Sequence, residues 1–470
     1  MLSSRTALVG RLHSTGGSGT TCQGSAARAD RSARGTDQQG ELFVTDYDEV
    51  DFFTDASLIE DPYPFFEHLR AKCPITSTSD YGVMAVTGWD EASEIYRDVE
   101  TFSSCNAVIG PFAEFPVPLE GDDVGAIIDQ YRDHLPMNEH MVTMDPPMHT
   151  NERALLMRLL TPRRLKENED FMWRLADRQL DEFLANGRCE FIREYAQPFA
   201  MFAVADVLGV PEEDHGEFRR FFGMSQPPGM VNKEDVRDDA PLNALDSLDD
   251  WFATYIEDRR ANPRKDVLTD LALGTYPDGS IPDVVNVVRS ATFLFAAGQE
   301  TTAKLLATCI LELCENPEVQ DELRAERELI PEFVEEALRL ESPVKADFRL
   351  ARRTTTVGGV EIKAGTPVML LNGAGRGSPR RFECPEEFRI RRPNSREHVA
   401  FGRGHHSCPG GPLARVEARV SLERILDRTR DLRLSEEHHG TKGDRRLDFE
   451  PTWILRGLTN INIEFTPVEA

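Results

Sequence analysis

The stretch HVAFGRGHHSCPGGPLARVEARV, from His398 to Val420, decides how this chain is interpreted. It joins a glycine-rich loop to the start of a helix, and a single cysteine, Cys408, stands at the junction. A thiolate at a helix N-terminus is stabilised by the helix dipole and by nearby backbone N–H groups, which suits it to bind a metal. Gly402, Gly404 and Gly410 would let the backbone approach a flat cofactor closely. The pattern therefore indicates a thiolate that holds a cofactor.

Two other interpretations of this stretch stay open on the residues alone. A lone cysteine is more often a buried structural residue in a turn. A zinc site is the second alternative, with His398, His405, His406 and Cys408 as its ligands. Zinc is disfavoured because most structural zinc sites use several cysteines, and this stretch has no spaced partner pair.

Composition sets the class of protein and excludes some partners. The 470 residues are 40% hydrophobic and 29% charged, which is typical of a globular chain with a large core. Because 54 basic residues face 81 acidic ones, a formal charge of -27 would repel nucleic acid and anionic lipid. Eight cysteines without a CxxC pair favour a reducing compartment and a cytoplasmic location. The longest apolar run, 291–313, contains Glu300 and Lys304, so we expect no membrane span.

The chain is expected to form one domain after an N-terminal tail. Residues 1–42 are rich in Ser, Gly and Arg and hold almost nothing that could be buried, which predicts an unstructured tail, although a transit peptide has a similar composition. Residues 43–470 contain no linker or repeat. Segments 106–138 and 224–243 are expected to be long, exposed connections, and the first of them to have a function.

Helical signals dominate this domain. The run Asp283–Glu315 lies between Pro282 and Pro317, which predicts one buried helix of about 30 residues, about 45 Å long. Further helices are expected over 150–208, 243–260 and 331–340, and a strand, turn and strand within 354–371. The predicted fold class is therefore mainly α with small β-sheets.

Three further motifs place polar groups at helical spacing. In AGQETT, Glu300 and Thr301 lie within the apolar helix, where a polar group needs either a hydrogen-bonded structural role or a proton path. Glu336 and Arg339 lie three residues apart, a spacing that is usually a surface ion pair. His149 and Arg153 lie one helical turn apart and could together bind an anionic group.

In this order and at these separations, the four motifs resemble the cytochrome P450 family of soluble bacterial type, from about Phe43 to Phe465. FGRGHHSCPG matches the family's heme-binding signature, so the resemblance implies heme b between the long helix and the cysteine loop, with Cys408 as its metal ligand. The same resemblance assigns further residues to roles. Cofactor-binding residues would be His149, Arg153, Arg349, His406, Phe401, Gly402 and Gly410; catalytic residues Glu300 and Thr301; substrate-binding residues Ala296, Ala297, Val344, Phe348 and Trp453; and structural residues Glu336, Arg339 and Arg392.

The implied activity is that of a heme-thiolate monooxygenase, which inserts one oxygen atom from O2 into a C–H bond of a lipophilic small molecule, such as a terpenoid, steroid, fatty acyl or aromatic compound. Electrons would come from a separate ferredoxin and ferredoxin reductase, and the enzyme would be a monomer. Residues 376–403 hold eight arginines and four acids, a local charge of +4 that would attract an acidic ferredoxin. The alternative is a heme-thiolate protein that binds or senses a ligand without turnover. GRGSP at 375–379 and Pro409 depart from the common family pattern.

Overall fold

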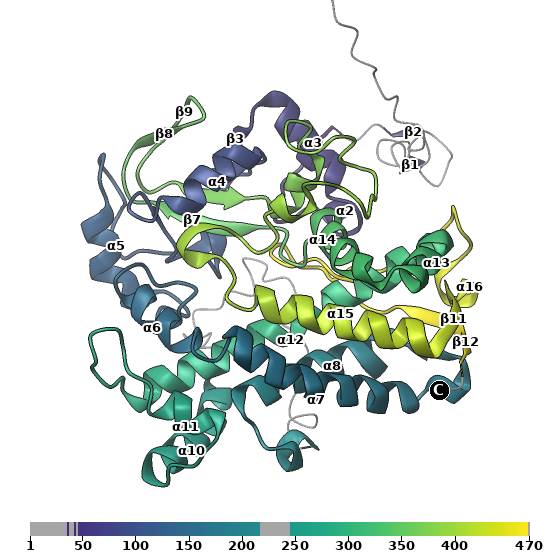
Figure 1. Cartoon of the computed structure of the whole chain (residues 1–470). Coiled ribbons are helices and arrows are strands. Elements are labelled where there is room, and N and C mark those ends of the chain that lie inside the picture. The colour runs from purple at the N-terminus through teal and green to yellow at the C-terminus, as the bar shows by residue number, and fades with distance from the viewer. Residues whose placement is uncertain (1–34, 37–41, 44–45, 217–244, 469–470) are drawn as a thin grey trace, which may run out of the picture.

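The computed structural model describes residues 35–36, 42–43, 46–216 and 245–468. Helices form the larger part of the body, and the sheets lie at its edges (Figure 1). In the part of the chain that the structure describes, none of the helices has the length and apolar character that crossing a membrane requires. The predicted fold class is confirmed.

The long buried helix is α12 (Val284–Glu315). It begins after Asp283, whose backbone is extended, and ends at Asn316, directly before the proline that opens α13 (Pro317–Ala325). Its apolar residues pack against α8 (Gln197–Leu208) and α10 (Asp246–Ala261). The predicted bounds of this helix are confirmed to within one residue. Within the expected helical range 150–208, Pro198 lies in the first turn of α8, where proline is tolerated.

Four other helices complete the body around α12. They are α6 (Met148–Leu156), α7 (Pro162–Asp181), α14 (Ile330–Leu340) and α15 (Gly411–Arg428). The side chain of Thr161 caps α7 by accepting a hydrogen bond from the Arg164 N–H over 3.3 Å. Helices α6, α14 and α15 all contact α12, so the motifs noted in the sequence converge on the central helix.

The main sheet has five strands in the order β3-β4-β10-β7-β5. Their bounds are β3 (Ile75–Thr78), β4 (Val83–Val86), β5 (Phe102–Ser103), β7 (Asp347–Ala351) and β10 (Pro367–Leu370). The expected strand, turn and strand are the hairpin β8 (Thr355–Val357) and β9 (Val360–Ile362), which turns at Gly358 and Gly359, both with positive φ. A second sheet pairs β11 (Thr429–Leu434), β12 (Asn462–Pro467) and β6 (Arg188–Glu190).

The remaining elements are short. They are α2 (Ser57–Glu60), α3 (Tyr63–Lys72), α4 (Trp89–Arg97), α5 (Gly125–Tyr131), α11 (Val267–Ala272), α16 (Glu436–His439), β1 (Gly35–Thr36) and β2 (Leu42–Phe43). Helix α5 corrects one expectation, because 106–138 is not a continuous loop: Gly125 and Ile128 of α5 are buried. Of the predicted tail 1–42, the structure describes only Gly35, Thr36 and Leu42, and the predicted connection 224–243 lies outside the described residues.

Candidate active site

The loop before α15 presents Cys408. Gly402 and Gly404 adopt positive φ angles of 59° and 68°, and a Cβ on Gly404 would lie 2.3 Å from the backbone oxygen of Tyr96, so only glycine fits there. The Cys408 N–H donates to the Phe401 carbonyl over 2.8 Å, which folds the loop back on itself. The Cys408 side chain is exposed, in contrast to that of Leu413 one turn further on.

The surroundings of the Cys408 sulfur act on its pKa in opposite directions. Burial among protein atoms raises the pKa of the thiol, whereas the backbone N–H groups of Gly410 and Gly411 and the charge of Arg153 lower it. The net direction is upward. Two backbone N–H groups and one guanidinium thus favour the thiolate form of Cys408, and they act against the effect of burial.

Four sequence-predicted residues lie near Cys408 as one cluster, the cationic cluster His149, Arg153, Arg349 and His406. The rings of His149 and His406 are 4.0 Å apart, and Arg153 reaches Ser407 Oγ over 3.3 Å. Arg349 lies over the ring of Tyr96 at 5.4 Å. Helix α6 provides the first two residues, strand β7 the third and the cysteine loop the fourth.

Several nitrogens of the cationic cluster are buried without a hydrogen-bond partner among the residues that the structure describes. They are both ring nitrogens of His149, Nη1 of Arg153 and Nε2 of His406. Burial and the charge of Arg153 lower the pKa of His149 to about 4, and burial with the charge of Arg349 lowers that of His406 well below its ordinary value. Buried donors of this kind are costly unless they are satisfied, so the cluster is suited to bind an anion.

The middle of α12 carries the predicted acid and alcohol. Thr301 donates its hydroxyl to the Ala297 carbonyl one turn earlier over 2.8 Å, and Glu300 accepts from Lys304 Nζ over 2.7 Å. Ala297 is exposed although Phe295 and Ala303 on the same helix are buried. Gly298 lies against Val204 of α8, where an added Cβ would be 3.3 Å away.

Glu336 of α14 joins the two arginines that the sequence grouped with it. Arg339 donates to both of its carboxylate oxygens over 2.8 Å, and Arg392 Nε donates to the same oxygens over 2.9 and 3.1 Å. The remaining guanidinium groups donate to the carbonyls of Glu383, Pro385 and Glu387. The Glu336 and Arg339 side chains are 0% exposed, so this is a closed internal network, not a surface ion pair.

Two of the five residues predicted to bind substrate do not reach open space. Phe348 is fully buried and Trp453 is 4% exposed, and their rings lie 5.0 Å apart in an aromatic cluster with Phe53 and Phe112. Both rings are packed against other aromatic side chains, and the substrate-binding role of Phe348 and Trp453 stays a prediction. Ala297 is exposed, and Ala296 and Val344 are half-buried.

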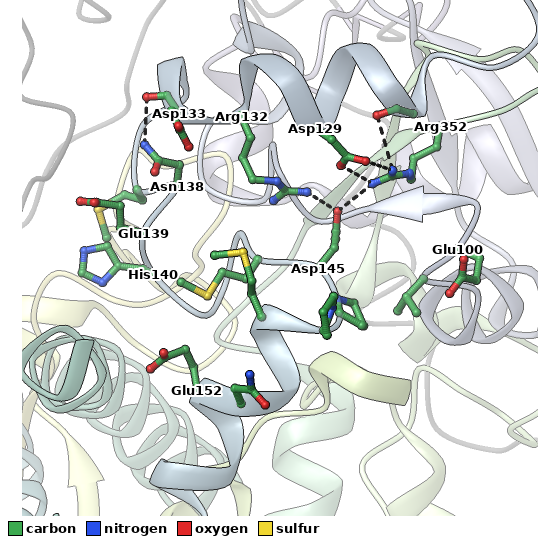
Figure 2. A pocket seen from close by; sticks show the side chains of 18 of the residues that line it. Glu100, Asp129, Arg132, Asp133, Asn138, Glu139, His140, Asp145, Glu152 and Arg352 are labelled. Atoms are coloured by element: carbon green, nitrogen blue, oxygen red, sulfur yellow. Dashed lines mark hydrogen bonds and ion pairs between the residues drawn. The ribbon is translucent and has the colours of Figure 1, made fainter. Parts of the chain in front are cut away.

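A polar pocket of about 1420 Å³ opens between α5, α6 and the first turns of α12, and the sequence did not indicate it (Figure 2). Arg352 makes a bidentate ion pair with Asp129 at 3.0 and 2.6 Å. It also contacts Asp145, which forms an ion pair with Arg132. The later half of segment 106–138 thus lines a charged opening, whereas Phe112 in its first half joins the aromatic cluster.

A thiol at a loop–helix junction and a buried cationic cluster define a protein that holds a flat, anionic cofactor against a sulfur ligand. Within the described ranges, no group of three or more His, Cys, Asp or Glu side chains is arranged to hold a metal ion.

The comparisons with known proteins agree with this description. The family model described as Cytochrome P450 matches residues 242–437. Cytochrome P450 144 of Mycobacterium tuberculosis is 33% identical over 385 residues, which cover 81% of this chain and 86% of that protein. The substrate-free structure of Mycobacterium marinum cytochrome P450 CYP150A6 is 59% identical with a TM-score of 0.84, and the match covers 90% of this chain and 100% of that one. CYP109E1 from Bacillus megaterium in complex with corticosterone is 26% identical with a TM-score of 0.72, over 87% of this chain and 100% of that one.

The chain belongs to the cytochrome P450 family. It is therefore a heme b enzyme of the monooxygenase class, which uses O2 and a small-molecule substrate.

Proposed function

We propose that this P450 hydroxylates a lipophilic small molecule with Cys408 as the sulfur ligand of its heme. The observation that carries the proposal is the exposed Cys408 thiol beside buried donors that lack a protein partner. When bound, the heme supplies the activation of dioxygen. The His149, Arg153, Arg349 and His406 side chains would hold its two propionates, because charge-assisted hydrogen bonds to carboxylates would satisfy donors that are costly to bury alone.

The polar pair on α12 would deliver protons. Thr301 donates its hydroxyl to the Ala297 carbonyl, and Glu300, the preceding residue of α12, accepts from Lys304 Nζ. We assign Thr301 to donate a hydrogen bond at the site where dioxygen is reduced, and Glu300 to supply the proton behind it. Glu336, Arg339 and Arg392 would have a purely structural role, since every one of them is buried.

The substrate is proposed to be apolar, in the classes of terpenoids, steroids, fatty acyl chains or aromatic compounds. Small side chains at Ala296 and Ala297 and the aliphatic Val344 leave an apolar surface open on and near α12. The complex of CYP109E1 with corticosterone supports a lipophilic ligand of steroid size as the first class to test.

A separate ferredoxin and ferredoxin reductase are proposed as electron donors, although the arginine-rich segment 376–403 offers less free charge than its sequence suggested. Arg380, Arg381, Arg389, Arg391, Arg392 and Arg396 each have a carboxylate within 4.0 Å. The better candidate surface is Trp89, whose ring lies between Arg381 at 4.3 Å and Arg403 at 4.5 Å. Burial and then the charges of Arg97 and Arg381 lower the pKa of Arg403, whereas Glu397 raises it, so several cationic side chains lie near this ring.

The spectrum of the reduced, carbon monoxide-bound protein tests the thiolate assignment. The wild-type protein is expected to give the red-shifted band typical of the family, and Cys408→Ser to lose it. Cys105→Ser is the matched control, because Cys105 is a buried cysteine outside the loop. An unchanged spectrum in Cys408→Ser would remove Cys408 as the ligand.

Turnover separates the monooxygenase proposal from a ligand-binding protein without turnover. We would titrate steroids, terpenes and fatty acids against the spin state, then supply a ferredoxin, its reductase and NADPH and look for a hydroxylated product. Binding without product from any donor would favour the sensor. Trp89→Ala should raise the ferredoxin concentration needed for half-maximal rate without changing substrate affinity.

A further inference from the structure

Lys304 is a buried cation held between two carboxylates. It lies one turn after Glu300 on α12, and its side chain is 5% exposed. Its Nζ is 2.7 Å from Glu300 Oε1 and 2.7 Å from Glu450 Oε2. Lysine is almost never fully buried unless it is paired, so the two carboxylates account for its position. The three side chains have a formal charge of minus one.

The segment 449–458 is shaped around the lysine stem. A Cβ on Gly457 would lie only 2.5 to 2.9 Å from Cγ, Cδ and Cε of Lys304, so a larger residue would displace the lysine. The Gly457 carbonyl accepts from the Glu450 N–H over 2.9 Å, and Phe449 and Leu458 pair as an isolated bridge. Because Gly457 has no side chain, the Lys304 stem can pass next to the backbone of this segment, and its ammonium can contact Glu450.

This arrangement connects the acid on α12 to a distant part of the chain. Glu300 adjoins Thr301, and a carboxylate on a helix surface can adopt several rotamers unless a partner selects one. The i, i+4 ion pair with Lys304 selects one rotamer of Glu300. The Lys304 ammonium is itself fixed in place because it also contacts the Glu450 carboxylate. Within segment 449–458, the Ile454 carbonyl also accepts a hydrogen bond from the backbone N–H of Lys345 over 2.8 Å.

We propose that Lys304 and Glu450 are positioning residues that hold the Glu300 carboxylate in the orientation needed to pass a proton to Thr301. The inference rests on the proposed roles of Glu300 and Thr301. Lys304 makes no contact with substrate in this role, and it acts only through Glu300. Removing the ammonium frees the carboxylate, and proton delivery becomes slower than the escape of reduced dioxygen as hydrogen peroxide.

The test uses the holoenzyme with a substrate that it hydroxylates. Lys304→Met should lower the ratio of product to NADPH about tenfold and raise peroxide correspondingly, while the spin-shift dissociation constant for substrate changes less than about twofold. Lys304→Arg should recover much of the coupling. Arg419→Met is the matched control, because it removes another i, i+4 ion pair, with Glu423 on α15.

A double-mutant cycle separates this inference from the proposed function beneath it. If Glu300→Gln leaves the peroxide yield unchanged, the role of Glu300 fails. If Glu300→Gln uncouples the enzyme but Lys304→Met does not, only the positioning inference fails. Adding Lys304→Met to Glu300→Gln should have no further effect on coupling.

Stability gives a readout that does not depend on activity. Lys304→Met leaves Glu300 and Glu450 facing each other, so the holoenzyme should unfold at a lower temperature, and Lys304→Met with Glu450→Gln should recover part of that loss. A full recovery of coupling in this double variant would also overturn the inference, because positioning requires the ammonium.

Discussion

Two clusters of charged and polar side chains, the network around Glu336 and the cationic cluster, differ in how many of their donors have partners. In the network around Glu336, both arginines donate to its carboxylate and to backbone carbonyls. In the cationic cluster, His149 has no partner at either ring nitrogen. Both clusters contain buried charged or polar side chains, although Arg153 and His406 are half-buried. The difference indicates that a saturated network serves the fold, whereas an unsaturated set of donors serves a ligand.

Glu336→Gln should break the saturated network with the largest effect on stability. The change leaves the guanidinium groups of Arg339 and Arg392 buried without their carboxylate, which typically costs about 3–5 kcal/mol. We would measure denaturant unfolding by circular dichroism. Glu322→Gln is the control, because Glu322 and its partner Arg391 are exposed, and it should change stability by less than about 1 kcal/mol. Equal effects of the two variants would contradict a structural role for Glu336.

His406→Leu should give the opposite pattern, with heme retention lost and little change in fold stability. The variant removes a buried Nε2 that has no partner among the described residues, and the fold loses one hydrogen bond, to the Met144 backbone, so stability should fall far less than in Glu336→Gln. A lost hydrogen bond to a charged group costs about 1.5–3 kcal/mol, which corresponds to heme transfer to apomyoglobin that is about ten to a hundred times faster.

A second buried histidine provides the control for this variant. His439 accepts from the Asn462 N–H over 2.7 Å, so it is partnered within the protein. His439→Leu should lower the unfolding temperature and leave the rate of heme transfer unchanged. A heme transfer rate for His406→Leu no faster than that of the wild type would remove His406 from the proposed propionate set.

Many of the residues in these two clusters belong to motifs that are local in the sequence, so their grouping could be predicted. Helix α12 lies between two prolines, and its bounds followed from them. Glu336 and Arg339 lie on one face of a helix, and the residues around Cys408 form one continuous loop. Their spacing in the sequence was therefore sufficient to group them. The family resemblance provided Arg349 and Arg392, which no local pattern connects to the others.

What the sequence did not reveal depends on packing between distant segments. Phe348 and Trp453 face each other across 105 positions, and apolar side chains carry no mark that separates a pocket wall from a core. Glu450 contacts Lys304 across a similar distance, and only the folded chain brings them together. The seven-residue helix α5 is too short for helical periodicity to stand out.

Two buried lysines among the described residues, Lys304 and Lys345, allow the same comparison of partnered and unpartnered charges. An ion pair with a carboxylate is formed by Lys304. Lys345 is 4% exposed, and its Nζ lies 5.7 Å from the centre of the Phe52 ring. Burial first, and then the charge of Arg456, lower the pKa of Lys345 to about 7. Lys304, with a similar burial, contacts two carboxylates.

Lys345→Met should therefore stabilise the protein in a pH-dependent way, with the smallest of the three effects. The folded protein holds Lys345 with a pKa of about 7 against 10.5 for an ordinary lysine, so the unfolded chain binds more protons between these values and wild-type stability falls as the pH falls from 10.5 to 7. Methionine removes that loss but also gives up the contact with Phe52, so the net gain in stability should be present at pH 7 and vanish above pH 10.5. Denaturant unfolding across this range measures it, and Lys304→Met should be destabilising at pH 7. If both variants changed stability in the same direction there, partnering would not be what distinguishes the two buried lysines.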